Sequence, residues 1–94
     1  MEALGHLYTR TGRYEDGLRI DLELTRRHSE DPENWYNLAC SYALVKQHDD
    51  AFTALDRAIQ TGYRDAEWLL KDEDLKPLRT DPRFRSIVAR VLNQ

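Results

Sequence analysis

The stretch that decides the fold is residues 32–62, PENWYNLACSYALVKQHDDAFTALDRAIQTG. Apolar residues recur at the i, i+3, i+4 and i+7 positions of one helix and at the i, i+4, i+7 and i+8 positions of a second. These positions hold Trp35, Leu38, Ala39 and Tyr42 in the first helix and Ala51, Leu55, Ala58 and Ile59 in the second. Because small residues let two helices approach closely, the pattern predicts a tight antiparallel hairpin.

The ends of both helices carry recognisable signals. Asp31 is suited to cap the first helix, and Pro32 is suited to its first position. The turn between the helices, residues 46–49, contains no glycine. If Lys46 adopts the left-handed conformation there, it costs about 1 kcal/mol relative to glycine; otherwise the turn has another geometry. Gly62 is expected to end the second helix.

The spacing resembles the signature of the tetratricopeptide repeat (TPR) family, in which W-x2-L-G-x2-Y, A-x3-F and a further A recur about every 34 residues. The residues that carry the resemblance are Trp35, Leu38, Ala39, Tyr42, Ala51, Leu55 and Ala58. Ala39 replaces a glycine, Leu55 replaces a phenylalanine, and Tyr63 stands where a proline often closes the repeat. The resemblance implies an all-α fold, an α-α superhelix built of helical hairpins.

We expect a single domain over residues 1–94. It would consist of a partial first repeat at 1–31, a second repeat at 32–65 and a helical C-terminal cap at 66–94. One repeat period before the second signature, Leu4, Gly5 and Tyr8 take the corresponding positions, and Gly12 is predicted to form the turn between two helices. The chain would then begin inside a repeat. We expect that it is part of a longer protein; the alternative is a natural N-terminal end with a degenerate first turn.

Residues 18–24 alternate between apolar and polar types, which is a strand pattern. We nevertheless predict a helix, because both flanks are helical and a single strand has no partner. Asp21 falls on the packing face of this helix, where an unpaired carboxylate is costly to bury. Either the helix rolls so that Asp21 reaches water, or Asp21 accepts a hydrogen bond from Tyr42 or Asn37 of the next helix.

The C-terminal third does not repeat the pattern. We predict a short helix at 66–71, a second short element at 73–79, and a last helix that begins at Pro82 with Thr80 or Asp81 as its cap. The apolar face of the last helix holds Phe84, Ile87, Val88, Val91 and Leu92. Such a helix can cover the terminal face of a solenoid. The run GYRDAEWLLKDEDLKPLRTDPRF resembles the ending of many bacterial TPR proteins, which implies a capping role and no assigned chemistry.

Charge and cysteine content bound the function. The net charge of −3 argues against binding to nucleic acid or anionic membranes. The single cysteine, Cys40, cannot form an internal disulfide, which predicts a reducing, cytoplasmic setting. Residues 65–74 hold five acidic residues and one lysine, whereas residues 76–94 hold five basic residues and one aspartate. These charges form either local pairs on solvated faces or a basic patch for an acidic partner.

The family resemblance implies that the first helix of each pair lines a concave wall that binds a partner peptide or helix. The residues expected on this wall are Glu2, His6, Thr9, Arg10, Glu33, Tyr36, Cys40 and Leu44. Tyr36 and Leu44 are expected to be exposed apolar contacts, with ordinary surface or a contact to a neighbouring helix as the alternative. Asn37 matches one position of the carboxylate clamp of chaperone-binding members. That clamp is not expected, because Glu2 and His6 stand where lysine and asparagine are required.

No pattern in the sequence indicates catalysis, a cofactor or a metal site. His6, His28 and His48 lie far apart, and residues 72–74 lack the glycine of a calcium loop. We therefore predict a protein-interaction module that binds a protein or peptide, has no enzymatic activity and contacts neither nucleic acid nor membrane. The alternative is structural: the chain caps a longer solenoid or forms a weak homodimer that buries Leu4, Leu7 and Tyr8.

Overall fold

A computed structural model describes the backbone of residues 2–93 and the side chains of residues 14–93. Its elements, in chain order, are α1 (Glu2–Arg27), α2 (Pro32–Leu44), α3 (His48–Gln60), α4 (Ala66–Lys71), the 3-10 helix η1 (Glu73–Leu78) and α5 (Pro82–Leu92). No strand occurs among residues 2–93. The all-α class is therefore confirmed, and the alternating residues 18–24 are helical as predicted.

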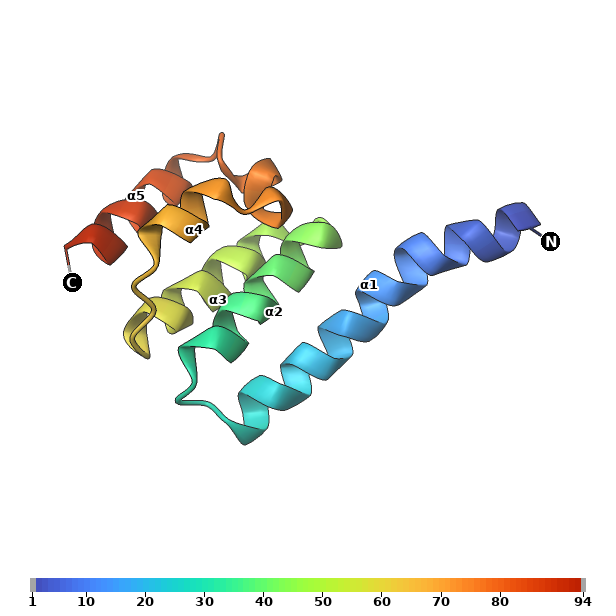
Figure 1. Ribbon diagram of the computed structural model, residues 1–94, viewed down its shortest axis with the longest axis horizontal. Coiled ribbons are helices and arrows are strands. Elements are labelled where there is room, and N and C mark those ends of the chain that lie inside the picture. The colour runs from blue at the N-terminus through green and yellow to red at the C-terminus, as the bar shows by residue number, and fades with distance from the viewer. Residues whose placement is uncertain (1, 94) are drawn as a thin grey trace.

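The helices form two layers (Figure 1). In the first layer α1 packs against α2, and α2 packs against α3. In the second layer η1 packs against α2, while α5 packs against both α3 and α4. The second layer consists entirely of the C-terminal third of the chain, so this third covers the α2–α3 hairpin.

Small side chains hold the α2–α3 hairpin together. Ala39 of α2 and Ala51 and Ala58 of α3 have no exposed surface, which confirms the predicted close approach. Leu38 and Leu55 fill the space around them and are also buried. The hairpin therefore follows from the sequence pattern.

Side-chain caps start the helices where the sequence predicts. The Asp31 carboxylate accepts the backbone N–H of Glu33 at 3.0 Å. The Asp81 carboxylate accepts the N–H of Arg83 at 2.9 Å, so Asp81 and not Thr80 caps α5. Each cap satisfies one of the N–H groups that have no partner inside the helix.

The predicted turn at Gly12 is wrong, because α1 is one continuous helix from Glu2 to Arg27. An isolated helix shorter than about 12–15 residues is marginal in water. A glycine inside a longer helix costs only about 1 kcal/mol. One helix that continues through Gly12 therefore costs less free energy than two short helices separated by a turn. The side chains of Leu4, Leu7 and Tyr8, which were expected to support a dimer, lie outside the described residues.

Asp21 combines features of both alternatives considered for it. It is half-buried, and its carboxylate accepts a hydrogen bond from the hydroxyl of Ser41 on α2. The partner is thus on the next helix, as one alternative required, but it is neither Tyr42 nor Asn37. A hydroxyl one helical turn beyond Asn37 satisfies the carboxylate and links α1 to α2.

The last helix covers α3 through its apolar face. Phe84, Ile87 and Val91 of the predicted apolar face are buried, whereas Leu92, which was placed on the same face, is 67% exposed. Two ion pairs also join α5 to α3: Arg83 contacts Asp49 at 2.9 Å, and Arg90 contacts Asp56. Exposed pairs of this kind contribute only about 0–1 kcal/mol. Apolar burial therefore holds the cap in place.

The turn between α2 and α3 has the predicted strain, because Lys46 has a φ of 67°. Replacing Lys46 with glycine should stabilise the protein by about 0.5–1 kcal/mol, since the left-handed strain removed exceeds the entropy that glycine adds to the unfolded chain. Urea unfolding measures the difference. The matched control is Gln47→Gly, because Gln47 has a φ of −100° and should lose stability on the same substitution. Equal effects of the two changes would contradict the account.

Candidate interaction surfaces

The predicted binding wall of α2 is covered by the chain itself. Tyr36, Cys40 and Ala43 follow one another at i, i+4 and i+7 and are all buried, Tyr36 with only 3% of its surface exposed. The expectation that Tyr36 is exposed is therefore wrong, and the alternative considered for it, a contact with a neighbouring helix, is confirmed. The stripe that was assigned to a partner is the seat of the C-terminal layer, because η1 packs against this side of α2.

An aromatic stack and a buried carboxylate fasten this layer to α2. The rings of Tyr36 and Tyr63 stack with centroids 4.6 Å apart and planes inclined by 5°. The Tyr36 hydroxyl donates to Oδ2 of Asp72 at 2.6 Å, and Sγ of Cys40 lies 3.6 Å from the same oxygen. Asp72 is itself buried, and it connects two elements that lie 32 to 36 residues apart in the sequence.

Asp72 also organises its own segment. Its Oδ1 accepts the backbone N–H of Asp74 at 2.9 Å and so caps η1. The guanidinium of Arg79 donates to the Asp72 backbone carbonyl at 2.8 Å. One residue thus caps the start of η1, binds the side chain of Arg79 just after η1 and contacts the facing side chains of α2. A hydrogen bond to a charged acceptor is worth roughly 1.5–3 kcal/mol, so this is a strong attachment.

The surroundings of this cluster raise the pKa of three of its groups, Cys40, Tyr36 and Asp74. Burial, reinforced by the charge of Asp72, raises the pKa of the Cys40 thiol far above its ordinary value. Burial and the hydrogen bond to Asp72 likewise raise the pKa of Tyr36. Burial, with Asp72 and Glu73 close by, raises the pKa of Asp74.

The ligand atoms of Cys40, Asp72 and Asp74 lie within 4.8 Å of one another, which is a spacing that could hold a metal ion. The chemistry does not favour one. A metal requires the thiolate, whereas this environment favours the thiol, and Asp72 already accepts hydrogen bonds from Tyr36 and Asp74. The cluster is a hydrogen-bonded attachment of the C-terminal layer.

Of the other residues predicted for the wall, the two whose side chains are described, Glu33 and Leu44, do not lie in one site. Glu33 is exposed near the start of α2, and Leu44 is half-buried at its end, where it lines a shallow hollow beside Tyr14 and Lys46. The two lie about 16 Å apart along the helix axis. Glu2, His6, Thr9 and Arg10 lie outside the residues whose side chains are described.

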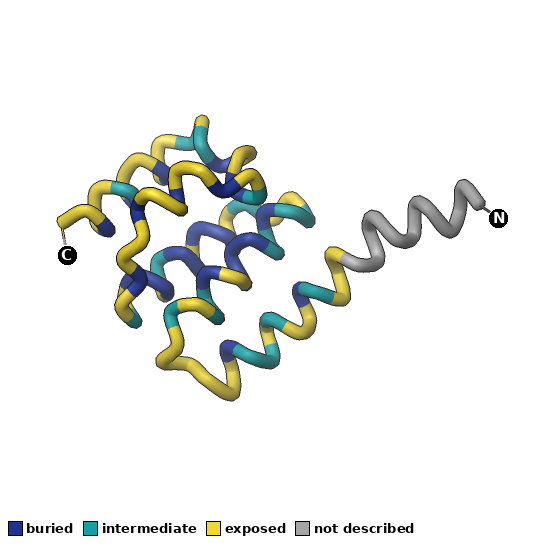
Figure 2. The backbone as a smooth tube through the Cα atoms, in the orientation of Figure 1, coloured by how far each residue is buried: buried dark blue, intermediate teal, exposed yellow. Residues whose placement is uncertain are grey.

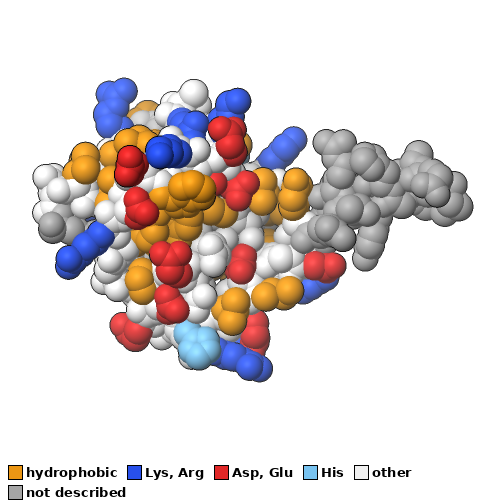
Figure 3. Space-filling model, viewed as in Figure 1, with side chains coloured by type: hydrophobic (Ala, Val, Ile, Leu, Met, Phe, Trp, Pro, Cys, Tyr) orange, Lys and Arg blue, Asp and Glu red, His pale blue; other side chains and the backbone are white. Residues whose placement is uncertain are grey.

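Over residues 14–93, large apolar side chains remain exposed in two other places. On α1 the exposed apolar residues are Tyr14, Ile20 and Leu22, and on the C-terminal layer they are Trp68, Leu70 and Leu92. Figure 2 shows the exposed and buried positions along the chain, and Figure 3 shows apolar side chains lying among charged ones on one face. Both places differ from the predicted wall.

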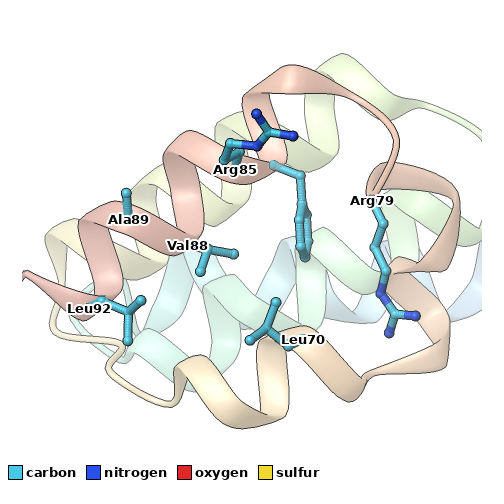
Figure 4. A pocket seen from close by; sticks show the side chains of 7 residues that line it. Leu70, Arg79, Arg85, Val88, Ala89 and Leu92 are labelled. Carbon is cyan, nitrogen blue, oxygen red and sulfur yellow. The ribbon is translucent and has the colours of Figure 1, made fainter.

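The second place contains a groove between α4 and α5 (Figure 4). It has a volume of about 450 Å³ and is lined by Leu70, Arg79, Phe84, Arg85, Val88, Ala89 and Leu92. Leu70 extends from α4 toward α5, while Val88 and Leu92 extend from α5 toward α4. Sequence reasoning missed this groove. The available signal was the Leu69-Leu70 pair, because adjacent residues of a helix cannot both face the same core.

Comparison with known proteins gives a partial match to a longer plant protein. No family model matches the chain, and no solved structure matches it. A curated chloroplastic protein of Arabidopsis thaliana is 30% identical over 83 residues, which cover 85% of this chain and 25% of that protein. The chain thus spans about a quarter of the length of this relative. Among the described residues, no helix is both long enough and apolar enough to cross a membrane.

Replacing Asp72 with alanine should destabilise the protein by about 2–3 kcal/mol, because the buried Tyr36 hydroxyl loses its acceptor and η1 loses its cap. Asp65→Ala is the control, because Asp65 caps α4 from an exposed position and its loss should cost only about 1 kcal/mol. Chemical denaturation of both variants measures the difference. Equal losses would mean that Asp72 acts only as a helix cap.

The raised thiol pKa predicts a loss of stability at alkaline pH. Below about pH 8.5 the thiol is neutral in both states, so Cys40 contributes no pH dependence. Above it, the unfolded chain releases the proton and the folded chain retains it, which should destabilise the fold by about 2 kcal/mol at pH 10. In Cys40→Ala the fall in stability between pH 7 and pH 10, measured in urea with a reductant present, should be smaller by that amount. Identical pH profiles for the two proteins would exclude a buried thiol.

Proposed function

We propose that the protein is a protein-interaction module of the tetratricopeptide type that binds a helix or peptide of a partner protein. The observation that carries the proposal is that, over residues 14–93, the C-terminal layer covers the α2–α3 side of the helix stack and nothing covers the outer face of α1. α5 packs against α3, whereas the α1 face turned away from α2 leaves Ile20 61% exposed. Exposed apolar surface marks an interaction site where several apolar side chains lie together, and Leu24 lies one turn from Ile20 on the same face.

The geometry of α1 supports a helix as the ligand of this face. Leu18 and Thr25 are buried on the side of α1 that packs against α2. Ile20 and Leu24 lie four residues apart on a different side, which places them one above the other. Two apolar residues at this spacing match the ridge that a second packed helix requires. In the family that this sequence resembles, a helix in this position packs between two neighbours.

The side of α2 that holds Tyr36 and Cys40 is not part of the proposed binding surface, because the C-terminal layer packs against it. The reducing, cytoplasmic setting expected from the single cysteine stays a prediction. The Arabidopsis relative supports the idea of a module, since the matching stretch makes up a quarter of that longer protein.

A structural role is the second candidate. The observation that favours it is the complete burial of Leu69, Leu75 and Leu78, which makes the C-terminal layer a closed end. In this case α1 would receive a helix of the same polypeptide or of a second copy, and no separate ligand would bind. A closed end of this kind is what a solenoid requires at its terminus.

The substitution Ile20→Glu tests the proposed surface. It places a charge on the open face of α1 and should reduce partner recovery in a pull-down from the native organism at least tenfold. Ser29→Glu adds the same charge in the exposed turn after α1 and should leave recovery unchanged. Both variants should keep the wild-type melting temperature, because both positions are exposed.

Two outcomes would contradict the interaction module. Equal recovery by wild type and Ile20→Glu would exclude α1 as the partner surface. A concentration-dependent dimer of the wild type in light scattering, lost in Ile20→Glu, would instead favour the structural role through self-association.

A further inference from the structure

We propose that the groove between α4 and α5 is a second docking surface that binds an acidic amphipathic helix. An apolar side chain of that helix would lie between Leu70 and Leu92, and its carboxylates would pair with Arg79 and Arg85. This inference goes beyond the proposed function, which uses the opposite end of the molecule. The two surfaces are tested by different variants, so either proposal can fail alone.

The groove offers an apolar floor with raised apolar edges. Phe84 is buried at its base, while Leu70 and Leu92 on the two sides are 50% and 67% exposed. Its volume of about 450 Å³ lies within the range of roughly 300–1,000 Å³ that is typical of ligand sites, but it is open along one side. An open trough between two helices fits a row of side chains better than an enclosed small molecule.

The arginines of α5 differ in their partners. Arg83 pairs with Asp81 and Asp49, both at 2.9 Å, and Arg90 pairs with Asp56. Arg85 lines the groove, is exposed and has no carboxylate within 4.0 Å among residues 14–93. The local charge pairing considered from the sequence thus applies to Arg83 and Arg90, whereas Arg85 is a positive charge with no acidic partner among residues 14–93.

Arg79 adds a second unpaired cation. In the part of the chain whose side chains are described, its guanidinium bonds only to the Asp72 backbone carbonyl, and its buried Nε has no acceptor. Arg79 and Arg85 lie toward the end of the groove where α5 begins (Figure 4). Among the lining residues none is acidic.

An apolar trough with a positive end is complementary to an apolar ridge flanked by carboxylates. Such complementarity orients a partner and excludes basic ones. Both walls of the trough are helices, and the described chain offers no strand edge for an extended peptide. The matching mode of recognition is therefore a helix in a groove, with apolar anchors at i, i+3 or i+4, and i+7.

Fluorescence anisotropy with two labelled synthetic peptides tests this inference. The first peptide is an alanine-based helix with leucines at i, i+4 and i+7 and glutamates on both sides of them. The second has every glutamate replaced by glutamine. Wild-type protein should bind the glutamate peptide with a Kd below about 1 mM and the glutamine peptide at least tenfold more weakly.

The protein variants locate the binding. Arg85→Glu should weaken the glutamate peptide at least tenfold, and Leu70→Gln with Leu92→Gln should do the same. All three positions are exposed, so these variants should remain folded. Arg64→Glu is the matched control, because Arg64 is exposed, unpaired among the described residues and outside the groove. It should change the Kd less than twofold.

Three results would overturn the inference. Absence of glutamate-peptide binding at 1 mM would exclude an acidic helix as the occupant. Equal binding of the two peptides, with no effect of Arg85→Glu, would leave only a non-specific apolar contact. A wild-type dimer in light scattering that the double leucine variant abolishes would assign the groove to a second copy of the chain.

Discussion

The structure depends on the burial of one side of α2 by the C-terminal third of its own chain. Tyr36 and Cys40 on α2 meet Tyr63 and Asp72, and the contacts comprise a ring stack, a 2.6 Å hydrogen bond and a thiol contact to a buried carboxylate. A buried carboxylate is costly unless it is satisfied, so this contact tolerates little displacement. The positions of the two short elements after α3, namely α4 and η1, follow from this contact.

This attachment decides which surfaces remain available to other molecules. In the family that the sequence resembles, the side of α2 that holds Tyr36 would be a wall for ligands. Here the chain occupies that wall, and α5 covers α3. Apolar surface is left at α1 and at the outer seam between α4 and α5. The same segment that covers Tyr36 and Cys40 thus forms a groove of its own, because α4 and α5 leave a trough where they meet.

The sequence predicted the elements well and the tertiary contacts only in part. Helical periodicity located α2, α3 and α5. Local chemistry identified the cap Asp31 and the strained Lys46, and it left the cap of α5 open between Thr80 and Asp81. Periodicity cannot tell whether an apolar stripe faces a partner or a later part of the chain, so Tyr36 was assigned to the wrong role. The groove at Leu70 was missed for a related reason. The Leu69-Leu70 pair indicates that one leucine faces away from the core, but a six-residue helix does not indicate what lies against it.

The accessibility of the Cys40 thiol tests the central claim most directly. It is the single cysteine, it is buried, and its Sγ lies 3.6 Å from the Asp72 oxygen that accepts the Tyr36 hydroxyl. Its rate of reaction with a thiol reagent at pH 8 should be at least a hundredfold slower in the native protein than in the same protein unfolded in urea. A native rate close to the unfolded rate would show that the wall of α2 is open, and the account of both remaining surfaces would then be contradicted.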